Sequence, residues 1–189
     1  MALLGETLDA LFQAGPSTLL SIPRFDKAID DRKPHSAWDV VAGAVDFIIL
    51  EGWCLGATPQ TSEELASPKN RLEELEDAQG AWRFHVNEKI KSEFLPLYDR
   101  IDRWLMLQAP SFDCVYQWRL EQEQKLADST AHGYVQGIMD KKALARFIQH
   151  YQRLTENCLT VLPDKTDYLY RLGDNREVLS FRSRSPTAR

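Results

Sequence analysis

The spacing of apolar and polar positions predicts helices that alternate with short strands. Helical spacing is clearest over 141–159, where apolar residues three or four positions apart form one face. The same spacing predicts further helices over 4–14, 67–75, 82–98 and 112–127. Residues 45–50 form a nearly continuous apolar run, which is the pattern of a strand buried on both faces of a parallel sheet.

Shorter apolar runs predict the other strands, at 18–23, 101–107, 167–172 and 177–181. The last two flank the turn residues Gly173-Asp174-Asn175. Strands that alternate with helices indicate an α/β fold with a mainly parallel sheet. We expect a single domain over 1–181 and a disordered basic tail over 182–189.

Composition and charge restrict the class of protein. A chain of 189 residues with 43% hydrophobic positions can bury a core. A formal net charge of −5, with both signs intermixed, argues against nucleic acid as the main partner. Three scattered cysteines without a CxxC pair argue against a disulfide framework or a zinc site, so we expect a reducing cytoplasm. The longest apolar run is too short to span a bilayer, and we expect no targeting segment.

Charged residues at strand ends are the first candidates for chemistry, because ligands of open α/β sheets bind beyond the carboxyl ends of the strands. Glu51 follows the most apolar run, where a carboxylate can hold a magnesium ion against nucleotide phosphates. The alternative is a solvent-facing glutamate at the start of a loop. The charges of 24–32 are interleaved in sign, so this segment forms either a polar substrate pocket or a solvated loop.

Two arginines on predicted helices, Arg119 and Arg153, are suited to binding phosphate oxygens, although surface charge pairs are commoner. The four histidines share no spacing that predicts a metal site. No base lies next to Cys54 in the sequence, so we expect it to be a small buried filler rather than a nucleophile.

Several ordered motifs resemble the D-glycerate 3-kinase family of P-loop kinases, which are relatives of uridine kinase and pantothenate kinase. The resemblance runs from about residue 1 to 178, and its motifs are PRFDKAIDDR at 23–32, EGWCLG at 51–56, an interrupted motif over 72–87, APSF at 109–112, WRLEQE at 118–123 and FIQHYQRLT at 147–155. It implies a three-layer P-loop kinase fold. It also implies phosphoryl transfer from ATP, with Mg2+, to a hydroxyl of glycerate or a similar small hydroxy acid.

The resemblance also implies roles for individual residues. Glu51 is the expected metal ligand and, with Arg119, a catalytic residue. The expected substrate-binding residues are Asp26, Lys27, Asp31 and Arg32, and the expected nucleotide-binding residues are Arg119, Arg153, Asp174 and Asn175.

The chain departs from the family pattern at the phosphate cradle. A P-loop needs glycine followed by Lys-Ser/Thr, yet none of the nine glycines precedes a lysine. The family's Asp-Asp-Phe-Tyr segment is also absent from the sequence. We therefore expect the N-terminal P-loop strand to be missing from a truncated kinase domain with little activity. The alternatives are a non-catalytic remnant or interaction protein that keeps the fold, and a nucleoside kinase that stacks its substrate on Phe25 or Trp38.

Overall fold

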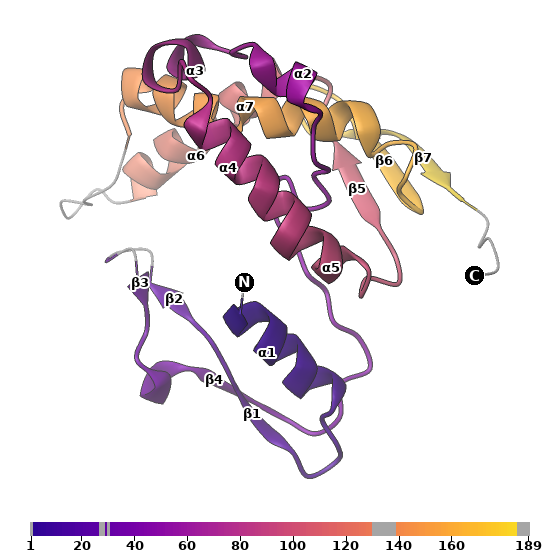
Figure 1. Ribbon diagram of the computed structural model, residues 1–189. Helices are drawn as coiled ribbons and strands as arrows, with labels where there is room; N and C mark the ends of the chain where they lie inside the picture. Colours follow the sequence, from indigo (N-terminus) through magenta and orange to yellow (C-terminus); the bar gives the residue numbers. More distant parts are fainter. Residues whose placement is uncertain (1, 27–28, 30, 130–138, 185–189) are drawn as a thin grey trace. The chain divides into compact units, whose positions relative to one another are not determined.

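The computed structural model describes residues 2–26, 29, 31–129 and 139–184 (Figure 1). The chain forms two compact units, Met1–Glu51 and Gly52–Arg189. The predicted single domain over 1–181 stays a prediction. Within the described residues, no helix is both long enough and apolar enough to cross a membrane.

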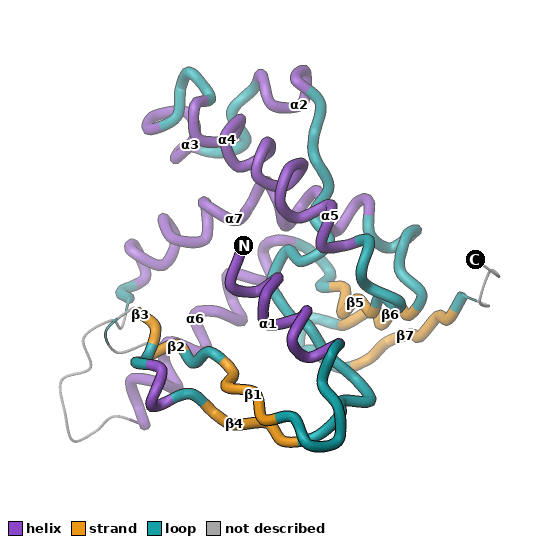
Figure 2. Tube along the Cα trace, turned by 60° about the horizontal axis from the view of Figure 1, so that its bottom comes forward, coloured by secondary structure: helices purple, strands orange, loops and turns teal. Residues whose placement is uncertain are grey.

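The described residues of the first unit form one α-helix and two small antiparallel ladders, whose strands are orange in Figure 2. Strand β1 pairs with β4, and β2 pairs with β3. The bounds are α1 Ala2–Phe12, β1 Leu19–Ile22, β2 Phe25–Asp26, β3 Asp31–Arg32, a 3-10 turn His35–Ala37 and β4 Asp39–Ala42. The helix predicted over 4–14 and the strand predicted over 18–23 are confirmed, although the strand lies in an antiparallel ladder.

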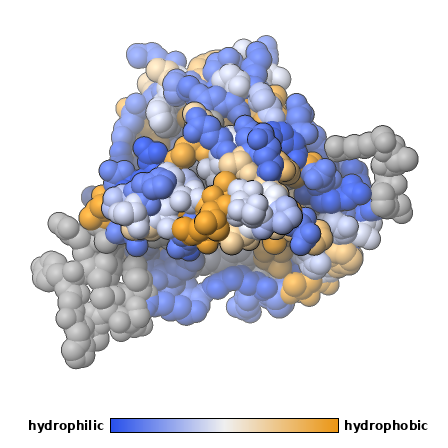
Figure 3. Space-filling model, turned by 90° about the horizontal axis from the view of Figure 1, so that it is seen from below, coloured by the Kyte–Doolittle hydropathy of each residue, from blue (hydrophilic) through white to orange (hydrophobic). Residues whose placement is uncertain are grey.

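The strand predicted over 45–50 is wrong. These residues have no regular secondary structure, and the side chains of Phe47 and Ile49 are 88% and 91% exposed. A strand buried on both faces needs neighbouring strands and a covering layer on each face, and no strand among the described residues pairs with this run. Its apolar side chains therefore reach the surface, and apolar patches are visible among polar residues in Figure 3.

The second unit begins with short helices and continues with two long ones. Its helical elements are α2 Ser62–Ala66, α3 Arg71–Glu76, α4 Ala81–Lys89, a π-helical turn Ile90–Phe94, α5 Leu95–Tyr98, α6 Phe112–Ser129 and α7 Lys141–Val161. The helices predicted over 82–98, 112–127 and 141–159 are confirmed. Helix α7 packs against α3 and α6 (Figure 1).

The predicted helix start at Ser67 is wrong. Ser67 ends α2, and α3 begins only at Arg71. The side chain of Asn70 caps α3 by accepting a hydrogen bond of 3.0 Å from the amide of Glu73. Asparagine and serine cap helices about equally well, so the pattern alone does not distinguish the two starts.

A three-stranded sheet completes the second unit, with strands β5 Leu105–Gln108, β6 Tyr168–Leu172 and β7 Val178–Ser183. Strand β6 is central; it pairs parallel with β5 and antiparallel with β7. The mainly parallel sheet is thus not found, because β5 and β6 are the only parallel pair in the described part of the chain. Strand β7 also extends to Ser183, into the tail predicted over 182–189, whose residues 185–189 lie outside the described residues.

The core of the second unit lies between the loop after Gly52, the α4–α5 segment and α7. Ala57, Ile90, Cys158 and Leu162 form one buried cluster. Gly56 lies beside it with φ at +91°, and a Cβ there would lie 3.1 Å from the ring of Trp104. Only glycine meets both requirements without strain.

Candidate functional site

A polar cavity of about 420 Å³ lies between α6 and the turn that joins β6 to β7. It is lined by Gln117, Trp118, Leu120, Glu121 and Gln124 of α6 and by Asp174, Asn175 and Arg176 of the turn. The structure therefore brings together two of the predicted nucleotide-binding residues, Asp174 and Asn175, from a segment that sequence analysis expected to be a turn. Residues of one face of α6 line the opposite wall.

The turn is closed by its own backbone. The amide of Gly173 donates to the carbonyl of Glu177 at 2.8 Å, and the amide of Arg176 donates to the carbonyl of Gly173 at 2.9 Å. Arg176 has a φ of +66°, in the left-handed region that turns use. The Glu177 carboxylate accepts from the amide of Asn175 at 3.1 Å. These contacts fix the conformation of the turn.

Contacts across the cavity hold the turn against α6. The indole N–H of Trp118 donates to the carbonyl of Asp174 at 2.6 Å, and the thiol of Cys114 donates to the Asp174 carboxylate at 3.3 Å. Arg176 pairs with Glu121 and lies 5.5 Å above the ring of Trp118. A tryptophan face beside carboxylate and amide groups is suited to a planar, hydrogen-bonding ligand.

Arg119 does not line this cavity. Its guanidinium pairs with Glu123 at 2.6 Å, donates to Gln122 at 3.1 Å and lies 5.9 Å above the ring of Phe147 on α7. Glu123 is only 4% exposed and also accepts from the amide of Met139 at 3.1 Å. The Arg119 Nε is buried and has no hydrogen-bond partner among the described residues.

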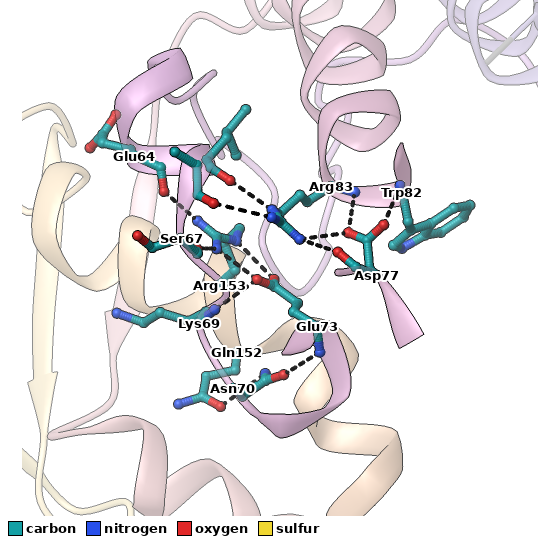
Figure 4. Close-up of polar contacts among 12 residues, drawn as sticks. Glu64, Ser67, Lys69, Asn70, Glu73, Asp77, Trp82, Arg83, Gln152 and Arg153 are labelled. Carbon is teal, nitrogen blue, oxygen red and sulfur yellow. Dashed lines mark hydrogen bonds and ion pairs between the residues drawn. The ribbon is translucent and has the colours of Figure 1, made fainter. Parts of the chain in front are cut away.

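Arg153 lies in a buried ion pair (Figure 4). Its guanidinium donates to both carboxylate oxygens of Glu73, at 2.8 and 2.6 Å, and to the carbonyls of Glu64 and Ser67 at 2.9 and 2.7 Å. Burial alone would raise the pKa of Glu73, but hydrogen bonds from Arg153 and the Lys69 amide, with the Arg153 charge, lower it overall. The hydrogen bonds of this guanidinium are thus made within the chain, which supports a structural role for Arg153 in place of the predicted nucleotide contact.

A second buried pair lies beside the first (Figure 4). Arg83 donates to the carbonyls of Leu65 and Ala66 at 2.6 and 3.3 Å and pairs with Asp77 at 3.2 Å. Asp77 also accepts from the Trp82 amide at 2.8 Å. Burial opposes ionisation of Asp77, but the backbone amides and the Arg83 charge lower its pKa overall. Together the two pairs join α2, α3, α4 and α7.

The predicted substrate-binding residues lie in the first unit. Asp26 of β2 and Asp31 of β3 are opposite each other, and Arg32 is opposite Phe25. The side chains of Asp31 and Arg32 are exposed. Lys27 lies outside the described residues, as does Asp30. The predicted loop therefore contains a short hairpin that carries two carboxylates and a guanidinium.

Glu51, the predicted metal ligand, is exposed and lies in neither a helix nor a strand. Among the described residues, no cluster of three or more histidine, cysteine, aspartate or glutamate side chains is arranged to hold a metal ion. The hairpin and Glu51 belong to the first unit and the cavity to the second, so their joint use in one site stays a prediction. The sequence gives no role to Trp118; the available signal is its place beside Arg119 on a predicted helix.

Comparisons with known proteins point to one family, although no family model matches the sequence. An uncharacterized kinase of Schizosaccharomyces pombe, mug58, is 28% identical over 184 residues, which cover 87% of this chain and 63% of the relative. The chloroplastic D-glycerate 3-kinase of Arabidopsis thaliana is 28% identical over 123 residues, which cover 62% of this chain and 25% of the relative.

Solved structures support the same fold. The D-glycerate 3-kinase of Cryptococcus neoformans has a TM-score of 0.76 at 20% identity, over 96% of this chain and 66% of that one. The YGR205w protein has a TM-score of 0.65 at 23% identity, over 97% of this chain and 63% of that one. The chain thus spans less than two thirds of the length of each of these proteins. The sequence relatives, in agreement with this fold, support membership of the chain in the D-glycerate 3-kinase family.

Proposed function

We propose that the chain is part of an ATP-dependent kinase that phosphorylates a hydroxyl of D-glycerate or a similar small hydroxy acid. The observation that carries the proposal is the 28% identity to a protein named D-glycerate 3-kinase, over 123 residues that cover 62% of this chain. A kinase of this type needs positioned substrates and neutralised phosphate charge rather than covalent chemistry. Residues of this chain would supply part of the substrate positioning and part of the charge neutralisation.

The cavity of the second unit would take the nucleotide base. Trp118 lines the cavity with an aromatic ring, over which Arg176 already lies, and Asp174 and Asn175 line it with hydrogen-bonding groups. Arg119 would reach phosphate oxygens only after leaving Glu123, to which it is bound in this structure. Glu51, a single exposed carboxylate, fits a Mg2+ ion that keeps several waters, and the bound ion would neutralise phosphate charge.

The β2–β3 hairpin would bind the acceptor. Arg32, with Lys27, would pair with the carboxylate of the hydroxy acid, because a guanidinium matches carboxylate oxygens in a bidentate fork. Asp26 and Asp31 would accept hydrogen bonds from its hydroxyl groups. The sequence contains no Gly-Lys pair to cradle phosphates, so we expect this chain alone to bind ligands with little turnover.

The test is calorimetric titration of the chain with ADP and, separately, with D-glycerate. Trp118→Ala should weaken ADP binding about five- to 150-fold, because stacking of one base contributes roughly 1–3 kcal/mol. It should leave D-glycerate binding unchanged. The matched control is Trp82→Ala, which removes an exposed tryptophan of α4 and should change neither affinity. Equal loss of ADP affinity in both variants would contradict a base site at the cavity.

The second candidate is a non-catalytic interaction protein. It is favoured by one observation, the absence of any glycine followed by lysine. Binding of neither ADP nor D-glycerate by the folded chain would support this function over the kinase.

A further inference from the structure

Two of the three cysteines lie together in the second unit. Cys54, in the loop after Gly52, packs against the buried core cluster that contains Cys158 of α7. Cys54 Sγ also lies 3.5 Å from the hydroxyl of Thr155, one helical turn before Cys158. The expectation that Cys54 is only a buried filler is therefore incomplete, because it packs beside a second thiol.

The loop holds Cys54 in this position. The indole N–H of Trp53 donates to the same Thr155 hydroxyl at 3.1 Å, and its ring stacks on Tyr151 of α7 at a centroid distance of 4.7 Å. Cys54 itself has a left-handed φ of +59°, and its carbonyl accepts from the amide of Ala57 at 3.0 Å. The tight turn thus presents the thiol to α7.

The two thiols differ in reactivity. The hydrogen bond from Cys158 lowers the pKa of Cys54, against the effect of burial and with help from Thr155. The same pairing, together with burial, raises the pKa of Cys158 well above its usual range. Cys54 is half-buried and Cys158 is 6% exposed. An oxidant from solvent would therefore meet the more acidic, more accessible thiol first.

We propose that Cys54 and Cys158 form a site of reversible oxidation, at which a peroxide converts the two adjacent thiols into a disulfide between the loop and α7. The Cys54 thiolate attacks one peroxide oxygen, the O–O bond breaks, and the departing hydroxide takes a proton to become water. The Cys158 sulfur then attacks the Cys54 sulfenic acid, the S–O bond breaks, and the Cys158 proton leaves with the hydroxide as a second water. A small-molecule thiol reverses the reaction by exchange.

The proposed oxidation site requires only the two thiols and is independent of the proposed kinase function. Cys114 is the internal reference, because it contacts Ser111 and Asp174 instead of a second thiol. The test treats the folded full chain with hydrogen peroxide, alkylates it under denaturing conditions and maps its peptides by mass spectrometry. We expect two of the three thiols to become unavailable, a cross-linked peptide pair that contains Cys54 and Cys158, and full recovery with a thiol reductant.

Variants identify the order of events. Cys158→Ala should leave Cys54 as a sulfenic acid that a dimedone probe captures, whereas Cys54→Ser should slow oxidation of Cys158 by at least about tenfold. Cys114→Ser is the matched control and should form the disulfide at the rate of the unaltered chain. Oxidation of Cys114 before the pair, or no cross-linked peptide after peroxide treatment, would overturn the proposal.

Discussion

Replacing Arg153 by methionine should strongly destabilise the protein. The change removes two hydrogen bonds to Glu73 and leaves its carboxylate buried without its ion-pair partner, while the carbonyls of Glu64 and Ser67 lose their donor. Removal of one member of a buried ion pair costs about 3–5 kcal/mol. In a protein of this size, that loss lowers the melting temperature by roughly 6–20 °C.

The same helix offers a matched control. Arg146 pairs with Glu76 at 2.5 Å, but the two side chains are 56% and 53% exposed. Arg146→Met should therefore cost no more than about 1 kcal/mol. Urea unfolding followed by circular dichroism at neutral pH measures both variants against the unaltered chain.

A double variant separates the ion pair from packing. Glu73→Leu combined with Arg153→Met removes both charges, so it should be less destabilised than Arg153→Met alone. The reasoning would be refuted if Arg153→Met lost no more stability than Arg146→Met. A stable Arg153→Met variant with weakened ADP binding would instead favour the nucleotide role that the resemblance implies for Arg153.

Three further predictions follow from the two units. The pKa values of Glu73 and Asp77 are lowered on folding from ordinary values of 4.5 and 3.8, so stability should hold above about pH 4.5 and fall on further acidification, less steeply in Glu73→Gln. Gly56→Ala should lower the melting temperature, because of its positive φ and the contact with Trp104, whereas Gly5→Ala on α1 should not. In a catalytically active form, Arg32→Lys should raise the KM for D-glycerate about ten- to a hundredfold and leave the KM for ATP unchanged, since a charge-assisted hydrogen bond contributes about 1.5–3 kcal/mol. Equal effects on the two KM values would contradict a carboxylate-binding role for Arg32.

Helices were predictable where one face is buried and the rest is solvated. In α7, Leu144 and Ile148 are almost fully buried and lie four residues apart, so periodicity alone indicates the helix. The run at 45–50 shows the limit of the same reasoning. An apolar run indicates that its side chains favour burial. Whether they are buried depends on neighbouring strands, which the residues of the run do not specify.

The polar contacts were less predictable, because their partners are distant in the sequence. Trp118 and Asp174 meet only because the β6–β7 turn folds back on α6, and no spacing rule records that contact. Arg153 looks like a phosphate ligand in isolation, whereas its buried partner Glu73 is 80 residues away. The turn at Asp174 was predictable from its residue types, but the wall that faces it was not.

The most direct test of the proposed kinase function is D-glycerate-dependent release of ADP from ATP and Mg2+ in a coupled assay. It compares the chain as printed with a form extended upstream to include a Gly-Lys-Ser/Thr loop. We predict turnover of roughly 1–100 per second for the extended form, a marked loss in its Glu51→Gln variant and almost none for the chain alone. ADP release by the extended form that does not depend on D-glycerate or a related hydroxy acid, or turnover in that range by the chain alone, would contradict the account.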